Sequence, residues 1–242
     1  MPSDKLREDL PHPSSHLPRT RLDLIKGYKV HEKRTPSREV LLVTPSQTIG
    51  PFFPSQLLSS EETDLTRLDP SGPRAEGELI GVVGKIVDED GSPVRGALIE
   101  VWQANKWGKY DHPADITEQP LDRNFKGYGR TLTDDQGRYR FLTIYPGAYP
   151  NPGYDDWYRP PHIHFSIFAA GLMQRVITQM YFPGEELNDI DPILNAVEDL
   201  EARAHLIASH EELTDAESGD VSRCFGFDIV LRGHNETPFA VE

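Results

Sequence analysis

The chain has 242 residues, which is enough for one large domain or two small ones with a sizeable core. Its 39 acidic residues outnumber its 25 lysines and arginines and give a net charge of −14, which disfavours binding to nucleic acid or to an anionic membrane surface. The single cysteine, Cys224, excludes an intrachain disulfide framework and a cysteine-rich zinc site. No apolar run approaches the ~20 residues of a membrane helix, and residues 1–18 lack the apolar centre of a secretory signal. We therefore expect a cytoplasmic protein without a membrane segment.

Residues 1–77 form the first region along the chain, and they are polar and rich in proline. From about residue 20 the region contains apolar and aromatic side chains, which favour an extended N-terminal arm ordered against the body or a partner; these are Leu22, Leu24, Ile25 and Tyr28. A disordered tail is the other interpretation. Residues 78–242 are expected to form the main domain, in one structural unit with the arm.

Turn signals divide the main domain into short strands. Two β-rich runs flank the sequence Asp-Gly-Ser-Pro at 90–93, and two more flank Asp-Asp-Gln-Gly at 134–137. Residues 162–170 and 174–182 are expected to form a further antiparallel pair. These intervals are typical of a sandwich or a barrel.

The last part of the chain is predicted to contain one short helix and a final strand. The helix is expected within 192–209, where apolar residues recur at helical spacing: Val197, Leu200, Ala204 and Ile207. The strand is expected at 224–233, and the acidic residues 185–191 are interpreted as a solvated loop. The 21 prolines, 19 glycines and 37% hydrophobic content argue against a helical bundle.

The sequence His-Ile-His at 162–164 is the sharpest local signal of chemistry. Side chains two residues apart on a strand lie on the same face, so His162 and His164 can both reach one metal ion. Imidazole is the commonest metal ligand among side chains. Two strand histidines without a ligand role are the alternative that this pair alone leaves open.

The surroundings of the two histidines favour one class of metal over others. The chain has nine tyrosines, and a phenol with a pKa of about 10 needs a strongly Lewis-acidic metal, such as ferric iron, to bind as phenolate. No carboxylate follows His164 in an obvious position, which argues against a cupin-type Fe(II) or Mn site. It also argues against zinc hydrolysis, which requires three protein ligands and an open position.

Several motifs, in order and spacing, resemble those of the intradiol ring-cleavage dioxygenases, and specifically the β-subunit type of the protocatechuate branch. The resemblance extends from about residue 27 to 233, and its motifs are VWQAN at 101–105, GKY at 108–110, GRTLTD at 129–134, YPGAYP at 145–150, RPPHIHF at 159–165 and TQMYF at 178–182. It implies an all-β fold, an antiparallel prealbumin-like β-sandwich with long loops, one short helix and an extended N-terminal arm.

The resemblance also implies a set of site residues. Ferric iron, Fe(III), is expected to be held by four ligands: Tyr110, Tyr149, His162 and His164. Tyr149 is expected to leave the metal and act as a base, Arg159 to stabilise negative charge on the substrate, and Gln179 to lie near the substrate.

Residues that would contact the substrate are expected upstream and in the loop after Tyr149. Tyr28 and Arg34 match a short element that approaches the carboxylate end of the substrate. The family pattern has a tryptophan where this chain has Asn151 and an arginine where it has Asp111. These two departures predict a wider pocket with weaker attraction for an anionic substrate.

The expected reaction is insertion of both atoms of O2 between the hydroxyl-bearing carbons of protocatechuate or a related para-substituted catechol. The resemblance further implies a hetero-oligomer with a related α subunit. A catechol or hydroxyquinol 1,2-dioxygenase is the alternative enzyme. A non-catalytic binding module stays open because residues 81–94 also resemble prealbumin-like and carboxypeptidase regulatory β-modules.

Overall fold

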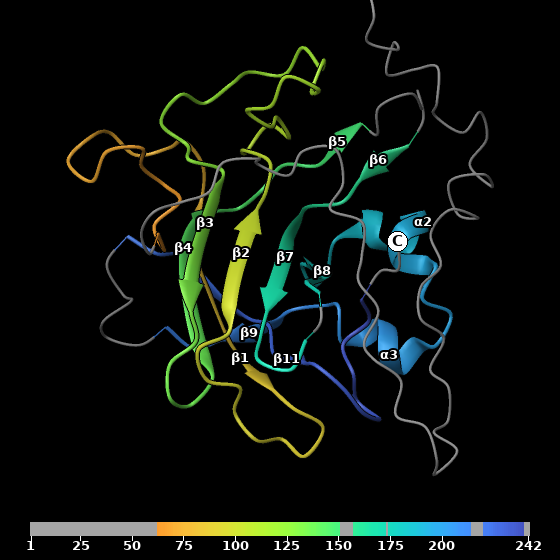
Figure 1. Cartoon of the computed structure of the whole chain (residues 1–242). Helices are drawn as coiled ribbons and strands as arrows, with labels where there is room; N and C mark the ends of the chain where they lie inside the picture. Colours follow the sequence, from red (N-terminus) through yellow and green to blue (C-terminus); the bar gives the residue numbers. More distant parts are fainter. Residues whose placement is uncertain (1–61, 151–156, 173, 214–219, 240–242) are drawn as a thin grey trace, which may run out of the picture.

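A computed structural model describes residues 62–150, 157–172, 174–213 and 220–239. Within them the chain forms two main β-sheets, a two-stranded ribbon and a few helical turns (Figure 1). The expected N-terminal arm lies outside the described residues, and the boundary at residue 78 stays a prediction. Leu65, just before that boundary, is fully buried in the core.

The first sheet is built around the long strand β1. It pairs antiparallel with β4 and parallel with both β10 and β11, and β9 extends the sheet beyond β10. The bounds are β1 Leu79–Val87, β4 Arg138–Ile144, β9 Ser209–Glu211, β10 Arg223–Gly226 and β11 Ile229–Val230. The predicted final strand is thus two short strands, β10 and β11.

The second sheet supports the candidate site, and all its pairings are antiparallel in the order β3-β2-β7-β8. A separate ribbon joins β5 and β6. The bounds are β2 Leu98–Trp102, β3 Tyr128–Leu132, β5 Tyr149–Pro150, β6 Tyr158–Arg159, β7 His162–Phe168 and β8 Val176–Tyr181. The expected pairing of 162–170 with 174–182 is confirmed as β7 and β8.

The core lies between the two main sheets and confirms the all-β sandwich. On β4 the buried side chains of Tyr139, Phe141 and Thr143 alternate with the exposed arginines 138 and 140, as expected for a strand with one face in the core. Phe165 on β7 packs from the other sheet into the same apolar cluster. The aromatic rings of Tyr139 and Phe165 meet at 5.8 Å.

Strands that flank the two predicted turns do not pair with each other. β1 and β2 belong to different sheets, and so do β3 and β4. Gly137, with φ of +72°, ends the second turn next to the first, because its carbonyl accepts a hydrogen bond from the Ile86 amide at 2.9 Å. Each turn therefore carries the chain across the sandwich from one sheet to the other.

The single helix expected within 192–209 is two short helices, α2 (Pro192–Asn195) and α3 (Leu200–Ala204), after a 3-10 turn η2 (Glu186–Asp189). Asp191 and Asp199 each accept hydrogen bonds from the first turn of the helix that follows. Leu200, which the helical spacing placed on the apolar face, is 72% exposed. Val197 from the expected set is buried, and it packs with Leu194, Ala202 and Leu206 around Tyr181 of β8.

None of the helices in the described part of the chain is long and apolar enough to cross a membrane.

Candidate functional site

His162 and His164 begin the strand β7 and are both buried. Their Nε2 atoms lie 3.2 Å apart, while Ile163 between them points into the sandwich core. The ring of His164 stacks on Trp102 of the neighbouring strand β2 at 4.8 Å, with 2° between the planes. Strand pairing and stacking together fix the orientation of the two imidazoles.

Tyr149 brings a phenol to the same point. It lies on β5, directly opposite Arg159 of β6, and its hydroxyl is 3.3 Å from Nε2 of His162. The side chain is buried. The short ribbon β5–β6 therefore positions both a phenol and a guanidinium beside the histidine pair.

Tyr110 is the second phenol of the cluster, and a loop after β2 carries it. Its ring meets the ring of Tyr149 edge-on, with centroids 5.4 Å apart and an interplanar angle of 87°. The buried carboxylate of Asp115 accepts a hydrogen bond from the Tyr110 amide at 2.8 Å. It also forms an ion pair with Lys109 at 3.0 Å. These bonds hold the loop next to Tyr110 in one conformation.

The environment keeps Tyr110, His162 and His164 neutral when no cation is present. Burial, with the neighbouring Tyr149 as a second cause, raises the pKa of the Tyr110 phenol well above its ordinary value. Burial, then the positive charge of Arg159 and then His164, lowers the pKa of His162 well below its usual range. Burial and Arg159 lower the pKa of His164 to about 3. At neutral pH each imidazole therefore keeps a nitrogen lone pair that can bind a metal ion.

The hydrogen bonds of His162 indicate which nitrogen carries that lone pair. Nδ1 lies 2.7 Å from the carbonyl oxygen of Pro160, so Nδ1–H donates there and Nε2 faces Tyr149 and His164 unprotonated. A backbone carbonyl that orients a ligating histidine in this way is common in metal sites.

These donors fit a metal ion. Two ligands bound at about 2.1 Å and separated by about 90–110° are about 3.0–3.4 Å apart, and the Nε2–Nε2 and Nε2–hydroxyl distances here are 3.2 and 3.3 Å. Among the described residues no group of three or more His, Cys, Asp or Glu side chains could hold a metal. In this cluster phenol oxygens as well as imidazoles could bind a metal, and that donor set suits a hard cation of high charge.

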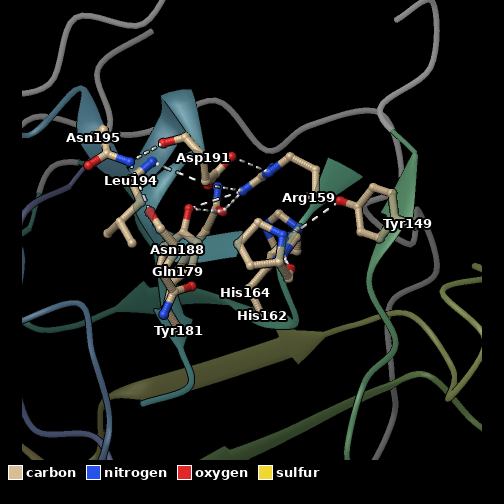
Figure 2. A network of polar contacts seen from close by, with 11 residues as sticks. Tyr149, Arg159, His162, His164, Gln179, Tyr181, Asn188, Asp191, Leu194 and Asn195 are labelled. Atoms are coloured by element: carbon tan, nitrogen blue, oxygen red, sulfur yellow. Dashed lines mark hydrogen bonds and ion pairs between the residues drawn. The ribbon is translucent and has the colours of Figure 1, made fainter. Parts of the chain in front are cut away.

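Arg159 connects the cluster to a second polar network (Figure 2). Its Nη2 donates to Oε1 of Gln179 at 2.7 Å and to the hydroxyl of Tyr181 at 3.0 Å, and its Nε donates to Asp191 at 3.1 Å. All four side chains are buried. The guanidinium is thus fixed beside the imidazoles by partners on β8 and at the start of α2.

The structure brings together six of the residues expected in the site, namely Tyr110, Tyr149, Arg159, His162, His164 and Gln179. Tyr28, Arg34 and Asn151 lie outside the described residues. Asp111 is exposed and lines a cavity of about 340 Å³ that also touches Tyr110 and Trp102.

Sequence reasoning missed three members of the site. Asp191 was interpreted as part of a solvated loop, but it is fully buried against Arg159. The Asp-Pro pair at 191–192 indicates only a helix cap, so nothing local pointed to the guanidinium. Trp102 and Tyr181 lie in motifs that matched, yet neither had an expected role.

Comparison with known proteins identifies the family of the chain. Residues 48–233 match the family model described as Dioxygenase. The chain is 43% identical to the protocatechuate 3,4-dioxygenase beta chain of Burkholderia cepacia, over 87% of this chain and 89% of that one. It is 34% identical to the alpha chain of the Pseudomonas putida enzyme, over 83% and 97%. The dioxygenase domain of a carbohydrate-binding fusion protein from Streptomyces sp. SirexAA-E has 30% identity and a TM-score of 0.55, covering 78% of this chain and 98% of that one. The chain therefore belongs to the intradiol ring-cleavage dioxygenases and resembles the β subunit of protocatechuate 3,4-dioxygenase.

Proposed function

We propose that the chain is the β-type subunit of a ferric intradiol dioxygenase that cleaves protocatechuate or a related para-substituted catechol. The product would be a 3-carboxy-cis,cis-muconate or its substituted analogue, with both atoms of O2 incorporated. The observation that supports this most directly is the convergence of two phenols and two neutral imidazoles beside one buried guanidinium.

Four side chains would hold the iron: Tyr110, Tyr149, His162 and His164. When bound, Fe(III) would supply the Lewis acidity that keeps the phenols ionised and makes a bound catecholate reactive toward O2. The geometry supports this assignment, because Nε2 of His162 lies 3.3 Å from the Tyr149 hydroxyl and 3.2 Å from Nε2 of His164, and the Tyr110 ring meets the Tyr149 ring edge-on.

Tyr149 would act as a base during substrate binding. Ionised while the metal is bound, its phenolate oxygen would accept one of the two catechol protons as the substrate takes its place, which returns Tyr149 to a neutral phenol. The position of Tyr149 on a two-stranded ribbon outside both main sheets supports this role, because the ribbon pairs over only two residues, Tyr149–Pro150 with Tyr158–Arg159.

Arg159 would stabilise negative charge on the substrate ring as oxygen adds. The guanidinium is buried, where a fixed positive charge acts more strongly than in water. Gln179 would keep it aimed at the substrate through the 2.7 Å hydrogen bond.

Substrate choice would depend on Tyr28, Arg34 and Asn151, with Asp111 at the edge of the site. We propose that the first two approach the carboxylate end of the substrate and that Asn151 lines the pocket wall. The identity to the beta chain of Burkholderia cepacia supports protocatechuate as the leading candidate. The similarity to an alpha chain supports assembly with a related α subunit, because it indicates that chains of both kinds share this fold.

A panel of kcat/KM values tests the substrate, using catechol, protocatechuate, hydroxyquinol and a catechol with a larger 4-substituent. We expect a para-substituted catechol to be preferred, with one O2 consumed per ring opened. Unsubstituted catechol or hydroxyquinol as the preferred substrate would move the chain to the 1,2-dioxygenase branch. A colourless protein that binds no iron and turns over none of the four would indicate a binding module instead.

A further inference from the structure

The loop that carries Tyr110 and the loop that leads to Tyr149 meet at one buried residue, Asn105. This residue follows the end of β2 and is 1% exposed. It lies five residues before one tyrosine in the sequence, and its backbone contacts the loop before the other. Its contacts account for the shape of both loops.

The Asn105 side chain forms the loop that leads to Tyr110. Its Oδ1 accepts hydrogen bonds from the amides of Trp107 at 2.9 Å and Lys109 at 3.0 Å. Its Nδ2 donates to the carbonyl of Pro120 at 2.8 Å, across the same long loop. An asparagine that accepts from the amide two residues on is the usual signature of an Asx turn. Lys109, the last residue held in this way, directly precedes Tyr110.

The Asn105 backbone reaches the loop that leads to Tyr149. Its carbonyl accepts hydrogen bonds from Gly108 at 3.0 Å and from Gly147 at 2.9 Å. Gly108 is two residues before Tyr110, and Gly147 is two residues before Tyr149. The Asn105 carbonyl therefore joins the two loops two residues before each phenol.

The two loops also touch without intervening side chains. A methyl group at Gly147 would lie 2.3 Å from the carbonyl oxygen of Lys106, and one at Gly108 would lie 2.3 Å from that of Ala148. Backbone atoms fill both spaces, so neither loop can shift without moving the other. The distance between the two tyrosine rings depends on this contact, because only two residues of chain separate the contact from each tyrosine.

We infer that Asn105 is a positioning residue that sets the separation and mutual orientation of the Tyr110 and Tyr149 phenols. The inference rests on the proposed function, in which both phenols bind iron. The edge-on contact of the two rings, at 5.4 Å and 87°, is the arrangement that Asn105 would maintain. Partners that orient metal ligands from outside the coordination sphere typically affect metal affinity by 10–100-fold.

Two substitutions test the inference on the iron-loaded enzyme. Asn105→Ala removes the acceptor for Trp107 and Lys109 and the donor to Pro120. Gly147→Ala disrupts the same contact between the loops from the other side. Its effect is a steric clash alone, because the backbone at Gly147 is not in the left-handed region. For both variants we expect the tyrosinate-to-iron visible band to shift and a strong chelator to remove iron at least about tenfold faster.

A matched control is Thr133→Val. The Thr133 hydroxyl also makes two buried hydrogen bonds to backbone, from the amide of Ala97 at 2.9 Å and to the carbonyl of Val94 at 2.7 Å. It follows the end of β3 that lies farthest from Trp102. We expect an unchanged band and iron release within about twofold of the unsubstituted chain, even where thermal stability falls.

The outcomes separate the inference from the proposed function. An unsubstituted protein that holds no iron and shows no visible band would contradict the proposed function itself. A normal band in that protein, with an unchanged band and release rate in both Asn105→Ala and Gly147→Ala, would overturn the inference alone. If Asn105→Ala does not fold, the result for Gly147→Ala decides the question. A band shift in Thr133→Val equal to theirs would also overturn the inference, because any loss of packing would then suffice.

Discussion

Arg159 and Asp191 form an ion pair that is almost completely shielded from solvent, with Nε 3.1 Å from Oδ1 and side-chain exposures of 5% and 0%. The same carboxylate accepts a hydrogen bond from the Leu194 amide at 3.3 Å and so caps α2. One side chain therefore serves as the counter-ion of the guanidinium in the candidate site and begins the helix beside it. Removing the carboxylate charge would leave a buried cation without its counter-ion.

Asp191→Asn should destabilise the protein by about 3 kcal/mol and slow turnover, because asparagine caps a helix about as well as aspartate but leaves Arg159 without a counter-ion. Chemical denaturation and steady-state kinetics on the same preparation measure the two effects. Asp199→Asn is the matched control at the cap of α3, for which we expect a change below about 0.5 kcal/mol. Equal losses of stability in both variants would show that the stabilisation comes from the helix cap and not from the ion pair.

Acid should destabilise the metal-free protein through its two buried histidines. Burial lowers the pKa of His162 well below its usual range and that of His164 to about 3. Below about pH 6.5 the unfolded chain therefore binds protons that the folded chain does not, and folding stability falls as pH falls toward 3. Each histidine contributes about 1 kcal/mol per pH unit once the pH is below about 5.5.

Denaturant titrations at pH 7.5 and pH 5 measure this slope. The double variant with His162→Gln and His164→Gln should show a shallower loss of stability between the two pH values. An identical slope in the double variant would mean that other groups, such as surface carboxylates, dominate the acid response.

The two phenols should respond differently to loss of the hydroxyl. Tyr149→Phe should retain iron but shift the visible band and slow turnover, because three ligands remain and the proposed base is gone. Tyr110→Phe combined with His162→Ala should lose iron altogether. Elemental analysis and absorption spectra of the purified proteins distinguish these results. An unchanged spectrum for Tyr149→Phe would show that this phenol is not a ligand.

Assembly with an α-type chain should be required for full activity. Co-expression with a chain like the Pseudomonas putida alpha subunit, which is 34% identical to this one, should give a hetero-oligomer by light scattering. The chain expressed alone serves as the comparison. Full activity in a homo-oligomer of this chain would contradict the predicted partnership.

Local patterns predicted the parts of the site that lie on single strands. The pair His162 and His164 follows from the two-residue repeat of a strand, and the structure places both imidazoles on one side with Ile163 in the core. The phenols were not predictable in this way. Tyr149 reaches His162 from a two-residue strand, and Tyr110 meets Tyr149 from a loop, and the course of both segments depends on distant backbone contacts, so only the resemblance to a family indicated them.

The sheet to which each strand belongs, and the contact of Asp191 with Arg159, could not be predicted from the sequence for a similar reason. Turn residues at 90–93 and 134–137 indicate where the chain reverses but not which sheet it enters next. Asp191 meets Arg159 across 32 residues of sequence, and its local context is that of an ordinary helix cap. The helix prediction failed because apolar spacing cannot distinguish one helix from two short ones whose turns share a buried face.

The parallel pairing of β1 with β10 and β11 has a consequence for how the protein is made. Ile80 and Arg223 are neighbours in the sheet, and the Lys85 amide bonds Asp228, 143 residues along the chain. A ribosome must therefore release the chain as far as residues 223–230 before the strand at residues 79–87 acquires these partners. Contacts of such long sequence separation make folding slow. Until they form, β1 exposes an unpaired, apolar edge that favours aggregation at high expression levels.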